Sequence, residues 1–423
     1  MNIIEIEHQN PWWNNKNWVK EDLHLNKYKN SPVSHEWTMK LEKGVCVVYG
    51  PRQVGKTTWI KQQISKLENE NVLYIACDGI LSTKEFKDTL TQIFELKDFK
   101  YIFLDEIAYI DNWEQIIKYF IDQKKFKDKY LVLTGSSSIN MLKKAERLTG
   151  RLSKKKRFHP LTFKEFVDNK IKNPTTEQLY HLFRRYLLHG GFLKVINKFE
   201  QANFISADLL SDYSGAIDGE LSKAQRSPRI FNYIISKLIS ALTNTISWAS
   251  ISENEVSQPT VSEYIEISKL LMFNDYIENI ESYHKSFVKN KKVYFFDPFL
   301  FWIARYRIGK KEPIDETNIL KYESKLVENA VFSNISTYLD DRIELPDFEI
   351  RDFLFYSKTR KGEIDFVINN LKLEVKWTKD IRKKEKDVLY LTKTSLAKNE
   401  VPVYLFLYNI DEYLKNVKLQ TRP

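Results

Sequence analysis

The sequence predicts an α/β fold: a parallel β-sheet with helices on both faces, then a mostly helical middle region, then a second α/β domain. Three observations support this prediction. Short apolar runs alternate with helix-like segments between residues 41 and 160, as they do in βαβ units. The pattern is helical from about residue 163 to residue 320 and mixed from there to the end. A chain of 423 residues is also too long for a single hydrophobic core.

The first apolar run, residues 45–49, leads into a glycine-containing loop and then a helix-like run, residues 59–64. The loop matches the P-loop pattern G-x-x-x-x-G-K-[ST] and consists of Gly50, Pro51, Arg52, Gln53, Val54, Gly55, Lys56, Thr57 and Thr58. Backbone N–H groups of such a loop bind phosphate oxygens, and the N-terminal end of the next helix assists them. We therefore expect ATP here, with Lys56 on the β- and γ-phosphates and the Thr57 hydroxyl on Mg²⁺.

A second apolar run, residues 101–104, ends in two carboxylates, Asp105 and Glu106. Continuous apolar runs are typical of buried parallel strands, and ligands bind at the carboxyl ends of such strands. We expect Asp105 to hold the Mg²⁺ water shell and Glu106 to polarise the attacking water. An acidic turn after a strand is common by itself, but the upstream P-loop favours the catalytic interpretation.

A third run, residues 130–133, ends in hydroxyl side chains, of which Thr134 and Ser136 are candidates for contact with the γ-phosphate or the attacking water. The Gly-Ser-Ser-Ser stretch at 135–138 is also typical of an ordinary loop and helix cap. Both interpretations stay open.

Charge and composition favour a polyanionic partner and exclude some classes. The formal net charge is +10, from 66 basic and 56 acidic residues, and two basic runs lie at 151–157 and 382–384. This predicts DNA as a partner, although a solvated face explains either run alone. Cys46 and Cys77 lie in apolar runs, so we expect free buried thiols, and the histidines show no zinc spacing.

The sequence offers no basic leader and no uninterrupted apolar stretch of about 18 residues. We therefore expect an intracellular, cytoplasmic protein that does not contact membranes.

The middle region combines predicted helices at 206–217 and 228–242 with a helix–turn–helix pattern over 252–271. Two strand-like runs, 276–280 and 292–296, can pair as a wing. This order predicts a winged-helix domain, which can bind the DNA major groove. The longer helix carries Thr260, Ser262, Glu263 and Glu266 but no arginine, so packing against protein is an equally open role.

The C-terminal region contains a helix-like segment at 322–339 and strand-like segments at 351–357, 363–368, 372–377 and 402–408. Two of these strands form a predicted hairpin, turned at 369–370, that places Asp365, Glu374 and Lys376 on one sheet. Two carboxylates and a lysine suit a divalent metal and an activated water. Glu328 on the preceding helix can supply a further oxygen.

This hairpin resembles the PD-(D/E)xK nuclease core, in which the same residue types follow a helix that bears a glutamate. The resemblance implies a restriction-endonuclease-like fold and metal-dependent phosphodiester cleavage. An exposed hairpin with an ordinary Glu–Lys pair is the alternative, because short matches of this kind arise by chance.

Taken as a whole, the chain resembles AAA-type P-loop ATPases (AAA_14) whose C-terminal half is the DUF4143 domain, found in archaea and bacteria. The resemblance spans nearly the whole chain. Besides the motifs above, it rests on Gly150-Arg151, 160–166, Gly190-Gly191-Phe192, 294–298, Glu328-Asn329 and the Asn10-Pro11-Trp12-Trp13 lead. The family often has proline after Gly-Gly-Phe, where this chain has Leu193, so the turn near the expected nucleotide site is in doubt.

The resemblance also implies a role for Arg151, which could stabilise transition-state charge within the chain or across a subunit interface, as arginine fingers do. Arg147, one turn earlier, competes for that role, and either arginine could simply belong to a basic surface. Related ATPases often form rings, so a homo-oligomer is an open expectation.

The predicted domains are an N-terminal arm at 1–40, a P-loop ATPase core at 41–162, a helical lid or linker at 163–240, a winged helix at 241–315 and a nuclease-like domain at 316–423. The predicted function is a Mg²⁺-dependent ATPase that acts on DNA, with a nuclease-like C-terminal domain. The alternative is a nucleotide-gated switch or scaffold whose nuclease-like domain is inert and serves for binding.

Overall fold

The structure is a computed structural model. It describes residues 1–27, 29–136, 138–148, 150–252, 256–281, 290–343, 349–359, 362–378, 381 and 385–419. The chain divides into two compact units, Met1–His159 and Pro160–Pro423. Each unit is described by itself.

The first unit is built on a parallel five-stranded sheet with the order β2-β3-β4-β1-β5. Its strands are β1 (Gly44–Tyr49), β2 (Val72–Ala76), β3 (Tyr101–Asp105), β4 (Tyr130–Gly135) and β5 (Leu152–Arg157). The three central strands β1, β3 and β4 are buried along nearly their whole length. This confirms the predicted parallel sheet, because only strands covered on both faces read as continuous apolar runs.

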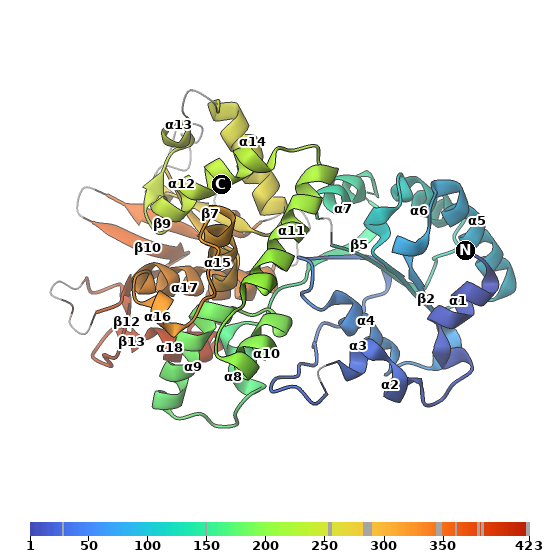
Figure 1. Ribbon diagram of the computed structural model, residues 1–423, viewed down its shortest axis with the longest axis horizontal. Helices are drawn as coiled ribbons and strands as arrows, with labels where there is room; N and C mark the ends of the chain where they lie inside the picture. The colour runs from blue at the N-terminus through green and yellow to red at the C-terminus, as the bar shows by residue number, and fades with distance from the viewer. Residues whose placement is uncertain are drawn as a thin grey trace. The chain divides into compact units, whose positions relative to one another are not determined.

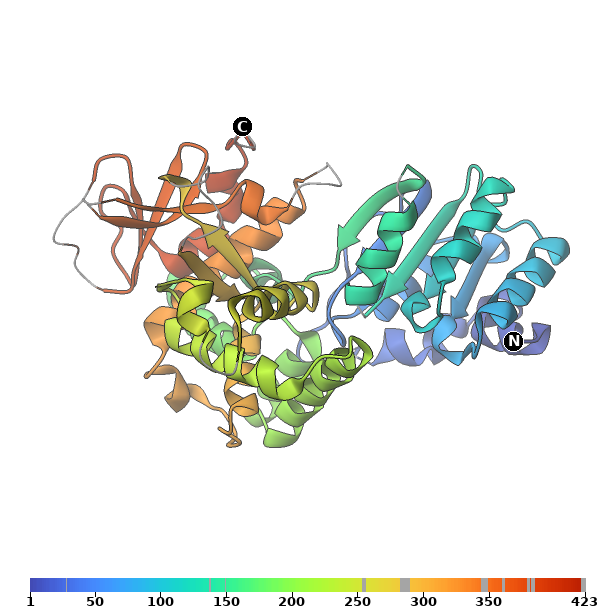
Figure 2. The ribbon, with the colours of Figure 1, turned by 90° about the horizontal axis from the view of Figure 1, so that it is seen from above.

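Helices cover both faces of this sheet (Figures 1 and 2). They are α1 (Ile3–Gln9), α2 (Trp18–Glu21), α3 (Leu23–Asn26), α4 (Lys56–Ile64), α5 (Thr83–Leu96), α6 (Trp113–Asp122) and α7 (Ser138–Ala145). Figure 1 shows α5, α6 and α7 on one side of the sheet and α3 and α4 on the other. Apolar side chains of α5 and α6 fill the core between these helices and the strands.

The N-terminal arm docks on the edge strand β2. The Asn10 side chain accepts the N–H of Tyr74 at 2.7 Å and donates to its carbonyl at 2.8 Å. The indole N–H groups of Trp12 and Trp13 both donate to the carbonyl of Val72. The arm therefore satisfies backbone groups that an edge strand would otherwise expose.

Strand β5 was not predicted, because its sequence is a basic run rather than an apolar one. It pairs in parallel with β1 at the edge of the sheet. Lys154 and Lys156 extend to the carboxylate of Glu42, at 3.3 and 2.6 Å. A strand at a sheet edge is half solvated, so charged residues are tolerated there.

The second unit begins with helices α8 (Phe163–Asp168), α9 (Thr176–His189), α10 (Leu193–Ala202), α11 (Ala207–Lys223) and α12 (Pro228–Ala241). The two amphipathic helices predicted from the sequence correspond to α11 and α12. Next come β6 (Thr245–Ile246), α13 (Trp248–Ile251), α14 (Gln258–Leu270), β7 (Asn274–Glu278) and β8 (Lys291–Phe295). The strands form an antiparallel sheet with the order β6-β8-β7, so the expected hairpin exists. The winged-helix assignment itself stays a prediction.

The last part of the unit contains α15 (Pro298–Arg307), α16 (Glu316–Ile319), α17 (Glu323–Asp340), β9 (Phe355–Lys358), β10 (Glu363–Ile368), β11 (Leu371–Lys376), β12 (Leu389–Thr392), β13 (Glu400–Pro402), α18 (Val403–Tyr408) and α19 (Ile410–Leu414). The sheet order is β13-β12-β11-β10-β9, with antiparallel pairs around β10 and parallel pairs around β12. This mixed sheet and the hairpin between β10 and β11 agree with the prediction.

The predicted strand at 402–408 is wrong, because Val403–Tyr408 is the helix α18. A short apolar run fits a buried helix as well as a buried strand, and periodicity cannot separate the two. Pro402 directly precedes the helix, and Tyr404 packs edge-on against Tyr180 of α9. Packing among helices thus decided the conformation of this segment. The strand predicted at 351–357 begins only at Phe355.

Two further predictions concern exposure to solvent and membrane. Cys46 and Cys77 are free and buried, as expected. Within the described ranges, none of the helices has the length and apolar character needed to cross a bilayer.

Candidate functional site

The P-loop joins β1 to α4 with an unusual backbone. Gln53 has φ of 62° and Gly55 has φ of 116°, both in the left-handed region. Gly55 is also the N-cap of α4, and no side chain caps the helix. The first N–H groups of α4 are therefore available to an anion, which the helix dipole also favours.

Close contacts with aromatic residues, one to the backbone and one to a ring, explain why two loop positions are glycine. A Cβ on Gly50 would lie 2.5 Å from the carbonyl oxygen of Phe158, and one on Gly55 would lie 2.4 Å from the ring of Trp37. The rings of Trp37 and Trp59 both pack against Phe158, with centroids 5.5 and 6.0 Å away. Trp37 of the N-terminal arm and Phe158, the residue after β5, thus pack against the P-loop.

Lys56 is buried and directed toward the loop. Its ammonium donates to the carbonyls of Gly50 and Pro51 at 2.9 and 3.0 Å and to the Ser136 hydroxyl at 3.2 Å. Lys56 is thus held at the mouth of the P-loop, next to the carboxyl end of β4.

Thr57 and Asp105 adjoin each other. The Thr57 hydroxyl donates to Asp105 Oδ2 at 2.7 Å, and the Tyr74 hydroxyl donates to the same oxygen at 3.0 Å. Thr134 donates to the other oxygen, Oδ1. A hydroxyl and a carboxylate side by side are hard oxygen donors, so these residues fit Mg²⁺. Tyr74 was missed by sequence reasoning, because a tyrosine within an apolar strand gives no local signal.

Glu106 follows β3 with a strained backbone. Its φ is 54°, which is uncommon for a residue with a side chain. Its N–H donates to the Thr134 hydroxyl at 3.2 Å, and its carboxylate accepts the Ser136 N–H at 2.8 Å and the Ser136 hydroxyl. Thr134 of β4 therefore contacts both acidic residues, and Ser136, which follows β4, bridges Lys56 and Glu106.

The two candidate arginines pair with acidic residues of α6. Arg151 Nε lies 3.2 Å from Asp122, and Arg147 lies 2.7 Å from the buried carboxylate of Glu114. Arg52 of the P-loop is partly exposed and donates to the Tyr109 hydroxyl at 2.5 Å. The geometry of this unit gives neither Arg147 nor Arg151 a contact with the P-loop lysine or with Glu106 among the described interactions.

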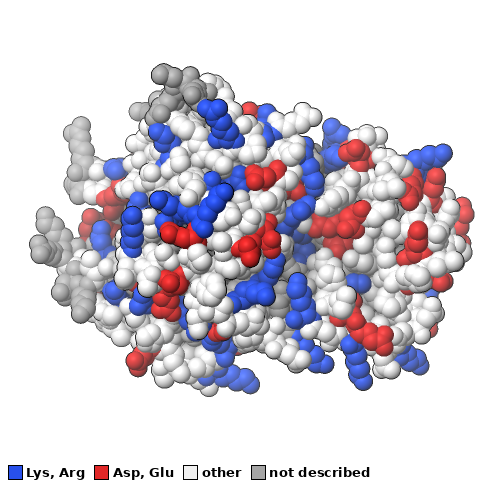
Figure 3. All heavy atoms as spheres, in the orientation of Figure 1, with Lys and Arg blue, Asp and Glu red and all other residues white. Residues whose placement is uncertain are grey.

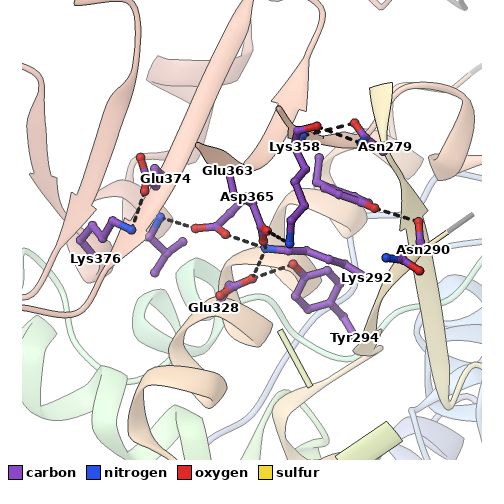
Figure 4. Close-up of polar contacts among 12 residues, drawn as sticks. Asn279, Asn290, Lys292, Tyr294, Glu328, Lys358, Glu363, Asp365, Glu374 and Lys376 are labelled. Atoms are coloured by element: carbon purple, nitrogen blue, oxygen red, sulfur yellow. Dashed lines mark hydrogen bonds and ion pairs between the residues drawn. The ribbon is translucent and has the colours of Figure 1, made fainter. Parts of the chain in front are cut away.

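The second predicted constellation surrounds a lysine that the sequence did not indicate (Figure 4). Lys292 of β8 lies 2.7 Å from Asp365, 2.7 Å from Glu363 and 3.3 Å from Glu328. Its side chain is 1% exposed. Glu374 pairs instead with Lys376 at 2.5 Å, to one side of the cluster. The signal that could have found Lys292 is a lysine within an otherwise apolar strand.

Lys292 and the acidic side chains around it shift one another's pKa. Burial alone would lower the pKa of Lys292, but the carboxylates of Glu328 and Asp365 raise that pKa above its usual value. Burial, assisted by the charge of Asp365, raises the pKa of Glu328 to about 8. The Tyr294 hydroxyl donates to Glu328 at 2.7 Å.

This arrangement does not fit the divalent metal expected at Asp365, Glu374 and Glu328. A lysine ammonium already occupies the space between the acidic oxygens, and Glu374 is turned toward Lys376. Across the described residues, no group of three or more His, Cys, Asp or Glu side chains is placed to hold a metal ion. The flanking basic residues Arg360, Lys361, Lys379 and Arg382 lie outside the described residues.

The Gly190-Gly191 turn lies in the second unit and wraps around a buried carboxylate. Asp297 accepts the N–H groups of Gly191 and Phe299, each at 2.8 Å. A Cβ on Gly191 would lie 2.0 Å from the carbonyl oxygen of Leu161. Leu193 is buried and is the first residue of α10.

Two family models match two separate parts of the chain. Residues 42–167 match the family model described as "AAA domain". These residues are similar to AAA domains, and they contain the P-loop, Asp105 and Glu106. Residues 180–310 match a domain of unknown function, DUF8612, so the expected DUF4143 domain is not supported by these two matches.

Two relatives are described as uncharacterized proteins. The protein MJ1544 of Methanocaldococcus jannaschii is 24% identical over 403 residues, which cover 88% of this chain and 83% of the relative. A Haemophilus influenzae protein is 25% identical over 311 residues, covering 68% of this chain and 73% of its own. The printed names of these relatives state no function.

Solved structures superimpose only loosely on this chain. The RuvB Holliday junction branch migration motor of Thermotoga maritima has a TM-score of 0.28 at 13% identity, covering 64% of this chain and 95% of that one. The ORC1 protein of Aeropyrum pernix, solved in complex with DNA, has a TM-score of 0.27 at 13% identity, covering 63% and 87%. At these TM-scores the overlaps support no conclusion about this chain.

Proposed function

We propose that this protein binds ATP at the P-loop and hydrolyses it with Glu106 as the residue that orients water. The observation that carries the proposal is the single constellation in which Ser136 contacts both Lys56 and Glu106, beside the Thr57–Asp105 pair. Hydrolysis requires a cation on the phosphates and a carboxylate near the attacking water. These groups lie at the carboxyl ends of β3 and β4 and at the start of α4.

Thr57 and Asp105 would hold Mg²⁺, which supplies charge neutralisation on the phosphates. Lys56 binds and orients phosphate oxygens, and the N–H groups of the P-loop donate hydrogen bonds to them. Ser136 occupies one acceptor site on each oxygen of Glu106, and the second lone pair of each oxygen can accept a hydrogen bond from the attacking water. A Ser136 hydroxyl that turns from Glu106 would donate to the developing phosphate charge.

The test is ATP turnover by Lys56→Ala, with Lys66→Ala as the matched control. Lys66 follows the same helix and makes an exposed ion pair with Glu36. We expect Lys56→Ala to lose turnover by about 10²-fold or more, since the lysine stabilises transition-state charge, and Lys66→Ala to retain it. Intact turnover in Lys56→Ala would overturn the proposal.

DNA is the partner that we propose for this ATPase. The support is the net charge of +10 and the order of elements α12, β6, α13, α14, β7 and β8, which is that of a winged helix. The predicted recognition helix α14 is not itself a strong reader. Much of it is buried, Glu263 is paired with Arg226, and Glu266 accepts the Tyr276 hydroxyl at 2.9 Å.

Phosphate contacts by surface lysines and arginines are therefore the expected binding mode. On the face drawn in Figure 3, basic side chains are interspersed with acidic ones. Affinity that falls steeply with salt supports DNA binding through phosphates. Affinity that is absent at low salt contradicts it.

A nucleotide-gated switch or scaffold is the second candidate function, and the position of Lys292 favours it over nuclease activity. In that case ATP sets the conformation of the chain and the C-terminal domain only binds. Cleavage of plasmid and linear DNA with Mg²⁺ or Mn²⁺, with and without ATP, separates the two. Cleavage that Asp365→Ala abolishes supports a nuclease, and ATP turnover without cleavage supports the switch.

A further inference from the structure

Lys292 lies at a crossing of three elements in the second unit. It comes from β8 of the three-stranded sheet, Glu328 comes from α17, and Glu363 and Asp365 come from β10 of the mixed sheet. The ring of Tyr356 also faces its ammonium, 5.9 Å away. A buried lysine in such a place needs partners, since an unpaired buried charge is strongly unfavourable.

The number of partners matches the chemistry of an ammonium group. Lysine has three N–H donors, and three carboxylates stand at 2.7, 2.7 and 3.3 Å from Nζ. A divalent ion would need oxygens at about 2.0–2.6 Å and would repel the ammonium. The distances from Lys292 Nζ to the acidic oxygens are therefore those of ammonium–carboxylate pairs and not those of metal ligands.

Two further oxygens of the cluster have partners of their own. Asp365 Oδ2 accepts the N–H of Val375 at 2.8 Å, and Glu363 also pairs with Lys358 at 2.8 Å. Figure 4 shows Lys292 between the acidic side chains, with the Glu374–Lys376 pair to one side. The pattern that resembles a nuclease thus has its central position filled from within the chain.

We infer that Lys292 is a built-in cation that replaces the divalent metal and fastens β8 to α17 and β10. The cluster is a structural hub that excludes divalent cations as long as β8 stays in place. Only removal of Lys292, by substitution or by displacement of β8, exposes the acidic oxygens to a metal. This inference does not depend on ATP hydrolysis, because none of its residues lies in the P-loop unit.

The test is Mn²⁺ binding by the full chain without nucleotide, measured by the paramagnetic resonance signal of free Mn²⁺. The variants are wild type, Lys292→Ala and Lys291→Ala, each with and without Asp365→Asn. Lys291 is the matched control because it is the neighbouring buried lysine on β8 and pairs with Glu278 at 3.5 Å. For each variant, the Mn²⁺ bound with Asp365→Asn is subtracted from the Mn²⁺ bound without it. The difference excludes any Mn²⁺ held at Thr57 and Asp105.

We expect no Asp365-dependent Mn²⁺ in wild type or Lys291→Ala, and one Asp365-dependent Mn²⁺ per chain in Lys292→Ala. Mn²⁺ should also raise the melting temperature of Lys292→Ala more than that of Lys292→Ala/Asp365→Asn, whereas Lys291→Ala and Lys291→Ala/Asp365→Asn should respond equally. A merely structural lysine does not predict this difference. Asp365-dependent Mn²⁺ binding by wild type, or none by folded Lys292→Ala, would overturn the inference.

If Lys292→Ala does not fold, the pair Lys292→Met and Lys292→Met/Asp365→Asn decides. Because Asp365→Asn removes the negative charge that Lys292 would pair with, the double variant should have a higher melting temperature than Lys292→Met. A double variant no more stable than Lys292→Met would show that Lys292 does not compensate Asp365, and it would equally overturn the inference.

Discussion

Gly190 is glycine because Asp297 occupies the space in which its side chain would lie. A Cβ at Gly190 would come within 1.7 Å of Asp297 Oδ1. The backbone angles of Gly190, φ of 56° and ψ of −147°, are essentially restricted to glycine. The turn and the buried carboxylate therefore specify each other across 107 positions of sequence, from residue 190 to residue 297.

Gly190→Ala should destabilise the second unit by about 3 kcal/mol or more, because it adds backbone strain and disturbs hydrogen bonds to a buried carboxylate. Urea unfolding followed by far-UV circular dichroism measures this. The control is Gly215→Ala, since Gly215 lies within α11 with open space around it. That control should be stabilising by about 0.5–1 kcal/mol. Equal stability of the two variants would contradict this account of the turn.

Asp297 should make the second unit less stable as the pH rises. Burial raises the pKa of Asp297 from 3.8 to about 7, against the two backbone N–H groups, which lower it. The folded state thus holds the proton more tightly, and stability present below pH 3.8 is lost as the pH rises through 7. The difference corresponds to on the order of 4 kcal/mol.

Unfolding of wild type and Asp297→Asn at pH 5 and pH 8 checks this expectation. Burial lowers the pKa of His189 to about 3, so His189 acts with the opposite sign, and only the difference between wild type and variant isolates Asp297. Wild type should lose stability relative to Asp297→Asn between the two pH values. A constant difference would rule out titration of Asp297 in this range.

Ser136→Ala should slow ATP hydrolysis by about 10²-fold, while ATP affinity changes little. The hydroxyl joins Lys56 to Glu106, and loss of one donor to transition-state charge has effects of this size. Single-turnover hydrolysis and nucleotide titration separate the two quantities. Ser65→Ala, an exposed serine at the end of α4, is the control. A variant that loses affinity and turnover equally would assign Ser136 to binding instead.

The alanine variants of Arg147 and Arg151 should differ from each other in stability and in ATP turnover. Arg147→Ala should destabilise the first unit by about 2 kcal/mol, because it leaves the buried carboxylate of Glu114 without its partner. Arg151→Ala should alter stability by less than about 1 kcal/mol, since its pair with Asp122 is exposed. If Arg151 acts across a subunit interface, its alanine variant loses turnover by about 10³-fold. Wild-type turnover per chain then rises with protein concentration, whereas full activity in Arg151→Ala would exclude the finger role.

The sequence by itself determined the nucleotide-binding half of this protein. The P-loop, Asp105 and Glu106 are local motifs, and buried parallel strands place them at one sheet edge whatever the details of packing. The amphipathic helices α11 and α12 and the hairpin at 369–370 also follow from short-range patterns. Local periodicity and turn chemistry carry this information within a few residues.

Tertiary structure alone decided the remainder. Strand β5 forms from a basic run because it lies at a sheet edge beside Glu42, and α18 is helical because it packs among helices. Asp365 pairs with Lys292 and not with the expected metal ion. Lys292 is 73 residues away in sequence and 2.7 Å away in space. The physical reason is the same in each case: a buried charge or apolar segment takes its role from partners distant in sequence, which no local pattern identifies.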